Sequence, residues 1–149
     1  MTITEPGTVA TTRRANSFQS LTRSAQVIVA VLACNLVVYA LGRAVGATFR
    51  YTHSGQVARV DAVAVTVMSV LPLATGLAFT AWLARRWLAL LTIARVLAPV
   101  LAVATIGAMT IPARFDATST LCLSTMHLAL IPAALYAIAG FEPMSDSTD

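Results

Sequence analysis

Four long apolar runs follow one another along the chain, with short polar segments between them. They cover residues 25–46, 62–84, 88–111 and 117–140. Each run approaches or exceeds the roughly 20 residues that an α-helix needs to cross a hydrocarbon core about 30 Å thick. The pattern therefore predicts an all-α fold, an integral membrane bundle of four helices.

Three of the runs contain an internal proline, namely Pro72, Pro99 and Pro132. In water an interior proline removes a hydrogen bond and usually breaks the helix. Within a membrane bundle, neighbouring groups can satisfy the carbonyl that the proline leaves unpaired. We therefore expect continuous but kinked helices.

Polar segments lie at both ends of the chain. Residues 1–23 are rich in Thr, Ser and Arg and show no apolar period, so a disordered cytoplasmic tail is expected. Residues 24–140 form the predicted transmembrane domain, and residues 141–149 form a short cytoplasmic tail. The segment TTRRANSF is similar to a twin-arginine export signal, but three further apolar runs favour an uncleaved first span.

The composition also indicates a membrane protein. Hydrophobic side chains make up 58% of the 149 residues and charged ones 11%, and the mean hydropathy is +0.79. Ordinary soluble domains carry about 25% charged residues. The net charge of +4 is spread over the tail and loops without a dense basic patch, so nucleic acid is not an expected partner. The expected partners are the lipid bilayer and either other membrane proteins or further copies of the chain.

The arginines predict how the chain is oriented, because basic residues are retained on the cytoplasmic side during insertion. Arg13, Arg14 and Arg23 precede the first run, and Arg85 and Arg86 lie between the second and third runs. We therefore expect a multi-pass protein of the cell membrane with both termini in the cytoplasm. Four further arginines lie in the two loops that this orientation places outside the cell, and they argue against it.

A short motif recurs where the second and fourth runs begin, as ARVDA at residues 58–62 and ARFDA at residues 113–117. A tandem two-helix repeat would produce this spacing, as in other membrane proteins built from parallel repeats. The alternative is chance, because alanine is common in the chain. Asp61 and Asp116 can cap the exposed N–H groups of the helices that follow them. They could instead line the charged mouth of a pathway, with Arg59 and Arg114 pairing with them or with lipid phosphate.

Three polar side chains are predicted near the middle of the membrane. At about 1.5 Å per residue, His127 lies about 16 Å from the outer side, Asn35 about 16 Å from the inner side and Arg95 about 12 Å from the inner side. Such groups usually face a bundle interior, so we predict a buried polar layer that could bind a ligand. Two alternatives remain: the third run starts after Arg95 and leaves it at the inner boundary, and His127 is a core histidine bonded to a neighbouring helix.

The first run also carries small residues on the face of Asn35. Gly42 and Gly46 form a small-xxx-small pattern, which permits close approach of another helix.

The chain offers no catalytic or metal-binding pattern. Asp116 and His127 share a helix face with a serine, but about 16 Å separates the two along the axis, too far for a catalytic triad. The other histidine, His53, lies in the outer loop, and the two cysteines form no CxxC motif. We therefore expect no metal, no cofactor and no enzyme activity.

The segment DATSTLCLSTMHLALIP begins with Asp116 at the outer end of a run and continues through Met126 and His127 into an apolar stretch. This segment resembles a family of small four-helix actinobacterial membrane proteins of unknown function. The resemblance covers residues 24–140. It implies a fold and no activity.

These features predict a non-enzymatic integral membrane protein, an accessory component of a larger membrane complex. The alternative is a small transporter or permease, with Asn35, Arg95 and His127 as a midplane site and the two aspartates at its entrance. A membrane enzyme acting on lipid or quinone is a third class.

Overall fold

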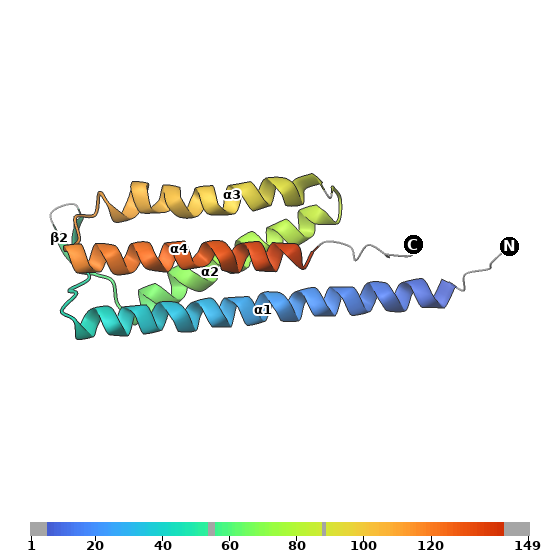
Figure 1. The fold of residues 1–149 in the computed structure, drawn as a ribbon, viewed down its shortest axis with the longest axis horizontal. Helices are drawn as coiled ribbons and strands as arrows, with labels where there is room; N and C mark the ends of the chain where they lie inside the picture. The colour runs from blue at the N-terminus through green and yellow to red at the C-terminus, as the bar shows by residue number, and fades with distance from the viewer. Residues whose placement is uncertain (1–5, 54–55, 88, 142–149) are drawn as a thin grey trace.

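The fold is a bundle of four helices that alternate in direction (Figure 1). A computed structural model describes residues 6–53, 56–87 and 89–141, with the backbone alone for residues 6–18 and 53. The helices are α1 (Pro6–Ala44), α2 (Ala62–Ala84), α3 (Ala89–Thr105) and α4 (Ala117–Ala139). A π-helical turn, η1 (Ile106–Thr110), continues α3. Strands β1 (Arg50–His53) and β2 (Gln56–Arg59) form a hairpin between α1 and α2.

All four helices are long and apolar enough to cross a membrane. The segments that meet this criterion are Gln19–Ala44, Ala62–Ala84, Ala89–Thr110 and Ala117–Ala139. Three of them agree with the predicted runs to within a residue or so, and α2, α3 and α4 run through their prolines without a break in helix. The prediction of an all-α, multi-pass membrane bundle is confirmed.

The connections define two ends of the molecule. The hairpin and the α3–α4 connection lie at one end, which we call the hairpin end (Figure 1). The start of α1, the α2–α3 turn and the end of α4 lie at the opposite end, which we call the terminal end. The first and last helices thus begin and end on the same side of the bundle.

Helix α1 is longer than the sequence analysis predicts. Its backbone is helical from Pro6, whereas a disordered tail is expected over residues 1–23. Proline suits the first position of a helix because that position needs no N–H donor. Extending an existing helix also avoids the unfavourable step of nucleation. Residues 1–5 and 142–149 of the two predicted tails lie outside the described residues.

The hairpin is an element that the sequence analysis misses. Its strands pair antiparallel, with Arg50 opposite Arg59 and His53 opposite Gln56. Four-residue strands with few apolar side chains give too short an alternating pattern to be distinguished from a polar loop. The hairpin is a small β addition to an otherwise helical fold.

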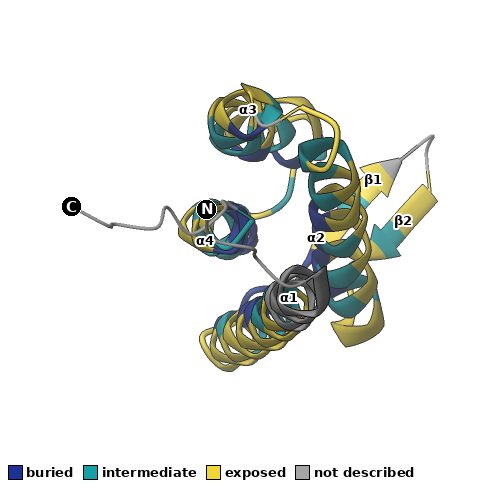
Figure 2. Cartoon of the chain, turned by 90° about the vertical axis from the view of Figure 1, so that its right-hand side faces the viewer, coloured by how far each residue is buried: buried dark blue, intermediate teal, exposed yellow. Residues whose placement is uncertain are grey.

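Buried side chains form two apolar clusters on the helix sides that face one another (Figure 2). The cluster of the terminal half contains Val27, Val31, Leu73, Leu77, Leu91, Ala134, Ala137 and Ile138. The cluster of the hairpin half contains Ala47, Phe49, Val65, Leu123 and Met126. On α2 the buried positions follow one helix face at every fourth residue, Val65, Ser69, Leu73 and Leu77, so the polar Ser69 separates the two clusters.

Gly42 permits the close approach of α1 and α4. A Cβ at this position would lie 2.8 Å from Sγ of Cys122 and 3.0 Å from Cζ of Phe49. The predicted role of the small residue is therefore confirmed for Gly42. Gly46 serves a different purpose, because its φ of +94° lies in the left-handed region and no described atom is within 4 Å of its Cβ position.

We expect Gly42→Ala to destabilise the protein, and Gly76→Ala to leave its stability unchanged or raised. The methyl group at position 42 must displace Cys122 or Phe49, and overpacking of this kind costs about 1–3 kcal/mol. At position 76 of α2 a Cβ meets no described atom within 4 Å, and alanine is the better helix former. Thermal unfolding of both variants in the same detergent provides the comparison.

A second substitution tests whether the loss arises at this contact. Cys122→Ala removes the sulfur nearest to the added methyl group, so it should restore part of the stability in the Gly42→Ala background. A Gly42→Ala protein that unfolds at the wild-type temperature would contradict the packing of α1 on α4 described above.

Candidate functional site

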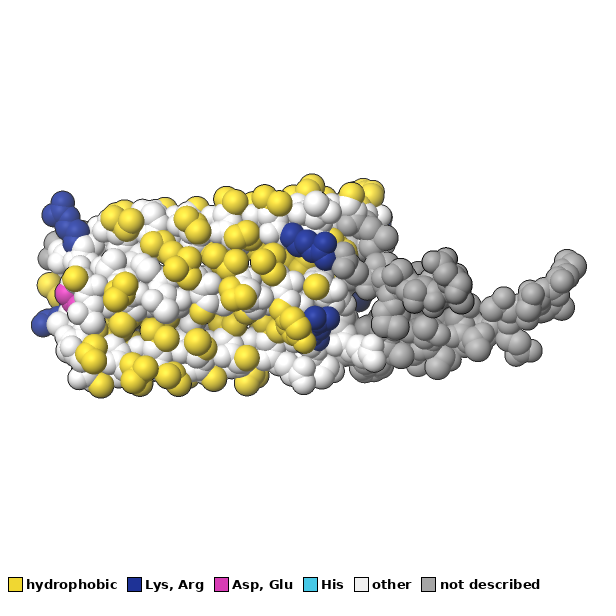
Figure 3. Space-filling model, viewed as in Figure 1, with side chains coloured by type: hydrophobic (Ala, Val, Ile, Leu, Met, Phe, Trp, Pro, Cys, Tyr) yellow, Lys and Arg dark blue, Asp and Glu magenta, His cyan; other side chains and the backbone are white. Residues whose placement is uncertain are grey.

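On the face shown in Figure 3, charged side chains lie at the hairpin end and in the part of the bundle toward the terminal end, and the section between them is apolar. The polar groups inside the bundle are therefore few, and each needs a partner or a function.

Asn35 lies at the centre of the α1–α2 contact. Its side chain is 2% exposed, and its Nδ2 donates a hydrogen bond to Oγ of Ser69 over 2.8 Å. The pair fills the level between the two apolar clusters. Its Oδ1 is buried and accepts no hydrogen bond from the described residues. A buried acceptor without a partner is costly, so a ligand that donates a hydrogen bond to this oxygen would stabilise the site.

His127 is half-buried on α4, and its ring bonds to its own helix. Nδ1 lies 2.8 Å from the carbonyl oxygen of Leu123. Because a carbonyl can only accept, Nδ1 carries the proton and donates it. The alternative of a core histidine bonded to a neighbouring helix is therefore wrong about the partner, because the ring bonds to the preceding turn of its own helix.

The three residues of the predicted layer do not share one level. Counted from the hairpin end of each helix, Asn35 lies about 13 Å and His127 about 15 Å into the bundle, whereas Arg95 lies about 22 Å from that end. Arg95 accounts for the difference, because its span extends to Thr110 and leaves it farther from the hairpin end than Asn35, whose span ends at Ala44. Arg95, half-buried on α3, belongs to the terminal half.

At the terminal end, Arg23 joins α1 to α4. Its guanidinium carbon lies 3.9 Å from the centre of the Tyr136 ring, a cation–π contact. Its side chain also passes over Gly140, where a Cβ would lie 2.7 Å from Cδ of the arginine. Arg23 is predicted only as an orienting charge, and its contact with Tyr136 is missed because nothing in the sequence indicates which helix faces it.

At the hairpin end, the carboxylate of Asp116 joins the end of α1 to the start of α4. Asp116 is the N-cap of α4, and its Oδ1 accepts from the N–H of Ser119 over 2.9 Å. Its Oδ2 accepts from Oγ of Ser119 (2.6 Å), and from Oγ1 (2.6 Å) and N–H (3.2 Å) of Thr48. One carboxylate therefore accepts four hydrogen bonds, two from each side of the junction.

These hydrogen bonds hold the pKa of Asp116 well below its ordinary value. The hydroxyl of Ser119 has the largest effect, followed by the hydroxyl of Thr48. Donors that point at a carboxylate favour its ionised form. Asp116 is thus a permanently charged structural group at neutral pH.

Phe49 completes the junction. It is fully buried, with a φ of +52°, and its ring packs against Tyr39 with 4.8 Å between centroids. Its N–H donates to Oγ of Ser119 (2.8 Å), and its carbonyl accepts from the N–H of Val60 (2.9 Å). A positive φ is unusual for a bulky residue, so these contacts hold the backbone in a strained conformation.

Asp61 caps α2 in the same way as Asp116 caps α4. Its Oδ1 accepts from the N–H of Ala64 over 2.8 Å. The predicted capping roles of both aspartates are confirmed. Within the described part of the chain, no ion pair joins Arg59 or Arg114 to either aspartate, and no three His, Cys, Asp or Glu side chains come together as a metal site.

We expect Asp116→Ala to destabilise the protein more than Asp61→Ala. Asp61→Ala removes one capping bond, and losing such a cap costs about 0.5–2 kcal/mol. Asp116→Ala removes a cap and also leaves Thr48 without its partner, which loosens α1 from α4. Thermal unfolding of both variants at pH 7 provides the measurement, and equal losses would contradict the junction.

The two variants also differ in their response to acid. The folded pKa of Asp116 is lowered, so its contribution to stability is fully present above the unfolded value of about 3.9 and is lost as the pH falls toward the folded pKa. Wild type and Asp61→Ala should therefore lose this increment between pH 5 and more acidic conditions, whereas Asp116→Ala should lose less stability over the same interval.

Comparison with known proteins identifies a family for this chain but no similar curated protein or solved structure. No curated protein and no solved structure matches the chain significantly. The sequence model of a family of unknown function, DUF6069, matches residues 16–141. The match confirms the resemblance to a family of unknown function. The chain, a multi-pass membrane protein by its four apolar helices, belongs to the DUF6069 family.

Proposed function

We propose that the protein is a non-enzymatic component of a membrane complex. It would lie in the cell membrane with both termini in the cytoplasm, and its partners would be the bilayer and another membrane protein rather than nucleic acid. Two features support the proposal: the use of the interior polar groups, and the outer surface of α3.

The polar groups that join helices within the bundle have structural uses. Asn35 joins α1 to α2, Arg23 joins α1 to α4, and Asp116 joins the same two helices at the other end. A catalytic group needs to be free to contact a substrate, whereas these side chains are held by their contacts with other helices. This argues for a structural role over catalysis.

The outer surface of α3 carries the proposal. Only Leu91 and Ala102 are buried on this helix. The large apolar side chains that remain exposed are Ile93, Val96, Leu97, Val100, Leu101 and Val103. Lipid or a helix of another protein can cover such a surface.

The second candidate function is that of a small transporter or permease. The observation that favours it is the unpartnered Oδ1 of Asn35, since buried polar groups inside membranes often mark a pathway. Arg95 lies at a different level, so a pathway would need to pass both groups in succession.

We expect a photo-crosslinking residue at Leu97 or Leu101 to form a discrete adduct with another protein in native membranes. The matched control is Val37, an exposed position in the apolar span of α1, which should give no such adduct. Mass spectrometry identifies the product. An adduct with a second copy of the chain, or no protein adduct from either α3 position, would contradict the proposal.

We expect the hairpin end to face outward. Thr52→Cys, on β1, should react with a membrane-impermeant maleimide in intact cells, whereas Arg86→Cys, in the α2–α3 turn, should react only after permeabilisation. Both residues are exposed, and both substitutions are made after Cys34 and Cys122 are replaced by alanine. The opposite labelling pattern would reverse the orientation.

A further inference from the structure

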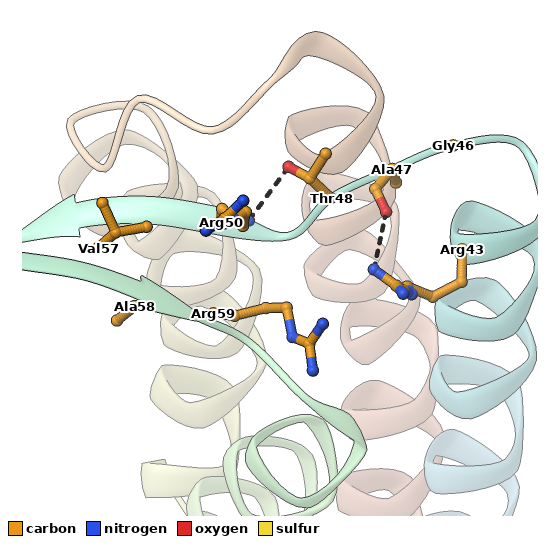
Figure 4. A pocket seen from close by; sticks show the side chains of 8 residues that line it. All are labelled: Arg43, Gly46, Ala47, Thr48, Arg50, Val57, Ala58 and Arg59. Carbon is orange, nitrogen blue, oxygen red and sulfur yellow. Dashed lines mark hydrogen bonds between the residues drawn. The ribbon is translucent and has the colours of Figure 1, made fainter.

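Three arginines surround a pocket of about 600 Å³ at the hairpin end. Arg43 comes from the last turn of α1, Arg50 from β1 and Arg59 from β2. The rest of the lining comes from the chain that leads into the hairpin and from β2: Gly46, Ala47, Thr48, Val57 and Ala58. Figure 4 shows the side chains of Arg43 and Arg59 extending toward each other across the space between α1 and β2.

The hairpin register places two of these arginines in directly opposed positions. Arg50 and Arg59 are directly paired across β1 and β2, so their side chains leave the same face of the hairpin. Like charges in directly opposed positions destabilise a strand pair. Nothing in the folding of a four-residue hairpin requires two arginines at these positions.

No carboxylate among the described residues neutralises the group. Asp61 and Asp116 are the only acidic residues of the described ranges, and neither forms an ion pair with Arg43, Arg50 or Arg59. The carboxylate of Asp116 is instead occupied by the donors of Thr48 and Ser119. Arg43 donates from Nη1 to the carbonyl oxygen of Ala47 over 3.4 Å, which leaves its charge uncompensated.

The pocket lies at the level where the membrane meets water. The apolar span of α1 ends at Ala44, directly after Arg43. Val57, on the pocket wall, is 63% exposed, so an apolar side chain lies open beside the arginines. A phosphodiester with hydrocarbon chains attached matches both properties.

We propose that Arg43, Arg50 and Arg59 form a binding site for a phosphate-bearing anion at the membrane surface. Guanidinium groups bind phosphate oxygens through paired, charge-assisted hydrogen bonds, and three of them on different elements can enclose one group. Binding removes the repulsion between Arg50 and Arg59 and fixes the hairpin to the end of α1. The phosphate belongs either to the head group of an anionic phospholipid or to a soluble compound.

Binding is measured on the full chain in a neutral detergent at constant ionic strength. One arm adds phosphatidylglycerol, with phosphatidylcholine as its control, and native mass spectrometry counts the retained lipid. The other arm adds inorganic phosphate, with chloride as its control, and follows the unfolding temperature. Retention of phosphatidylglycerol without any effect of phosphate on the unfolding temperature assigns the site to lipid, and a response to both probes assigns it to phosphate in general.

The variant Arg50→Gln/Arg59→Gln should weaken binding of the effective probe at least about tenfold, the factor set by losing one charge-assisted hydrogen bond. Arg85→Gln/Arg86→Gln removes the same charge from the terminal end and should bind as wild type does. Without added anion, the Arg50→Gln/Arg59→Gln protein should unfold at the wild-type temperature or above it, because the paired charges no longer repel. Equal binding by the two double variants, or no specific effect of either probe on wild type, would overturn the proposal.

Discussion

The association of α1 with its neighbours is the constraint on which the rest of the structure depends. Lipid chains are as apolar as leucine, so helices in a bilayer gain little by burying hydrophobic surface against one another. Close packing and a few polar contacts must then hold them together. Here α1 has such contacts at three levels, with Tyr136 near one end, Ser69 in the middle and Asp116 through Thr48 at the other end.

The use of Asp116 as a structural group determines the charge of the hairpin end. The described residues include two acidic side chains, and each is the N-cap of a helix: Asp61 of α2 and Asp116 of α4. The four arginines of that end are then left without carboxylate partners, and the fold gathers three of them around one pocket. The positive pocket is thus a consequence of the same hydrogen bonds that hold α1 to α4.

The sequence is sufficient to predict the features that depend on local pattern. The four spans follow from the length of the apolar runs, and the capping roles of Asp61 and Asp116 follow from their position before a run. Of the predicted layer, Asn35 and His127 lie at nearly the same level, whereas Arg95 lies closer to the terminal end, because depths counted from opposite ends of helices of unequal length do not coincide. The roles of Phe49 and Ser119 are missed altogether, since a buried residue with positive φ and a serine bonded across helices depend on which faces meet.

The recurring motifs ARVDA and ARFDA lie at the starts of α2 and α4, and both contact the apolar cluster that contains Phe49. Both motifs place an aspartate at an N-cap and a hydrophobic residue, Val60 or Phe115, against the same apolar cluster. The two starts differ three residues after the aspartate, where Ala64 offers only its N–H and Ser119 adds a hydroxyl. That hydroxyl accepts from the N–H of Phe49, while the carbonyl of Phe49 accepts from Val60. The strained residue Phe49 therefore contacts the start of α2 through Val60 and the start of α4 through Ser119. Because Ala64 has no hydroxyl, the segment that follows α1 bonds to Ser119 of α4 and not to the equivalent position of α2.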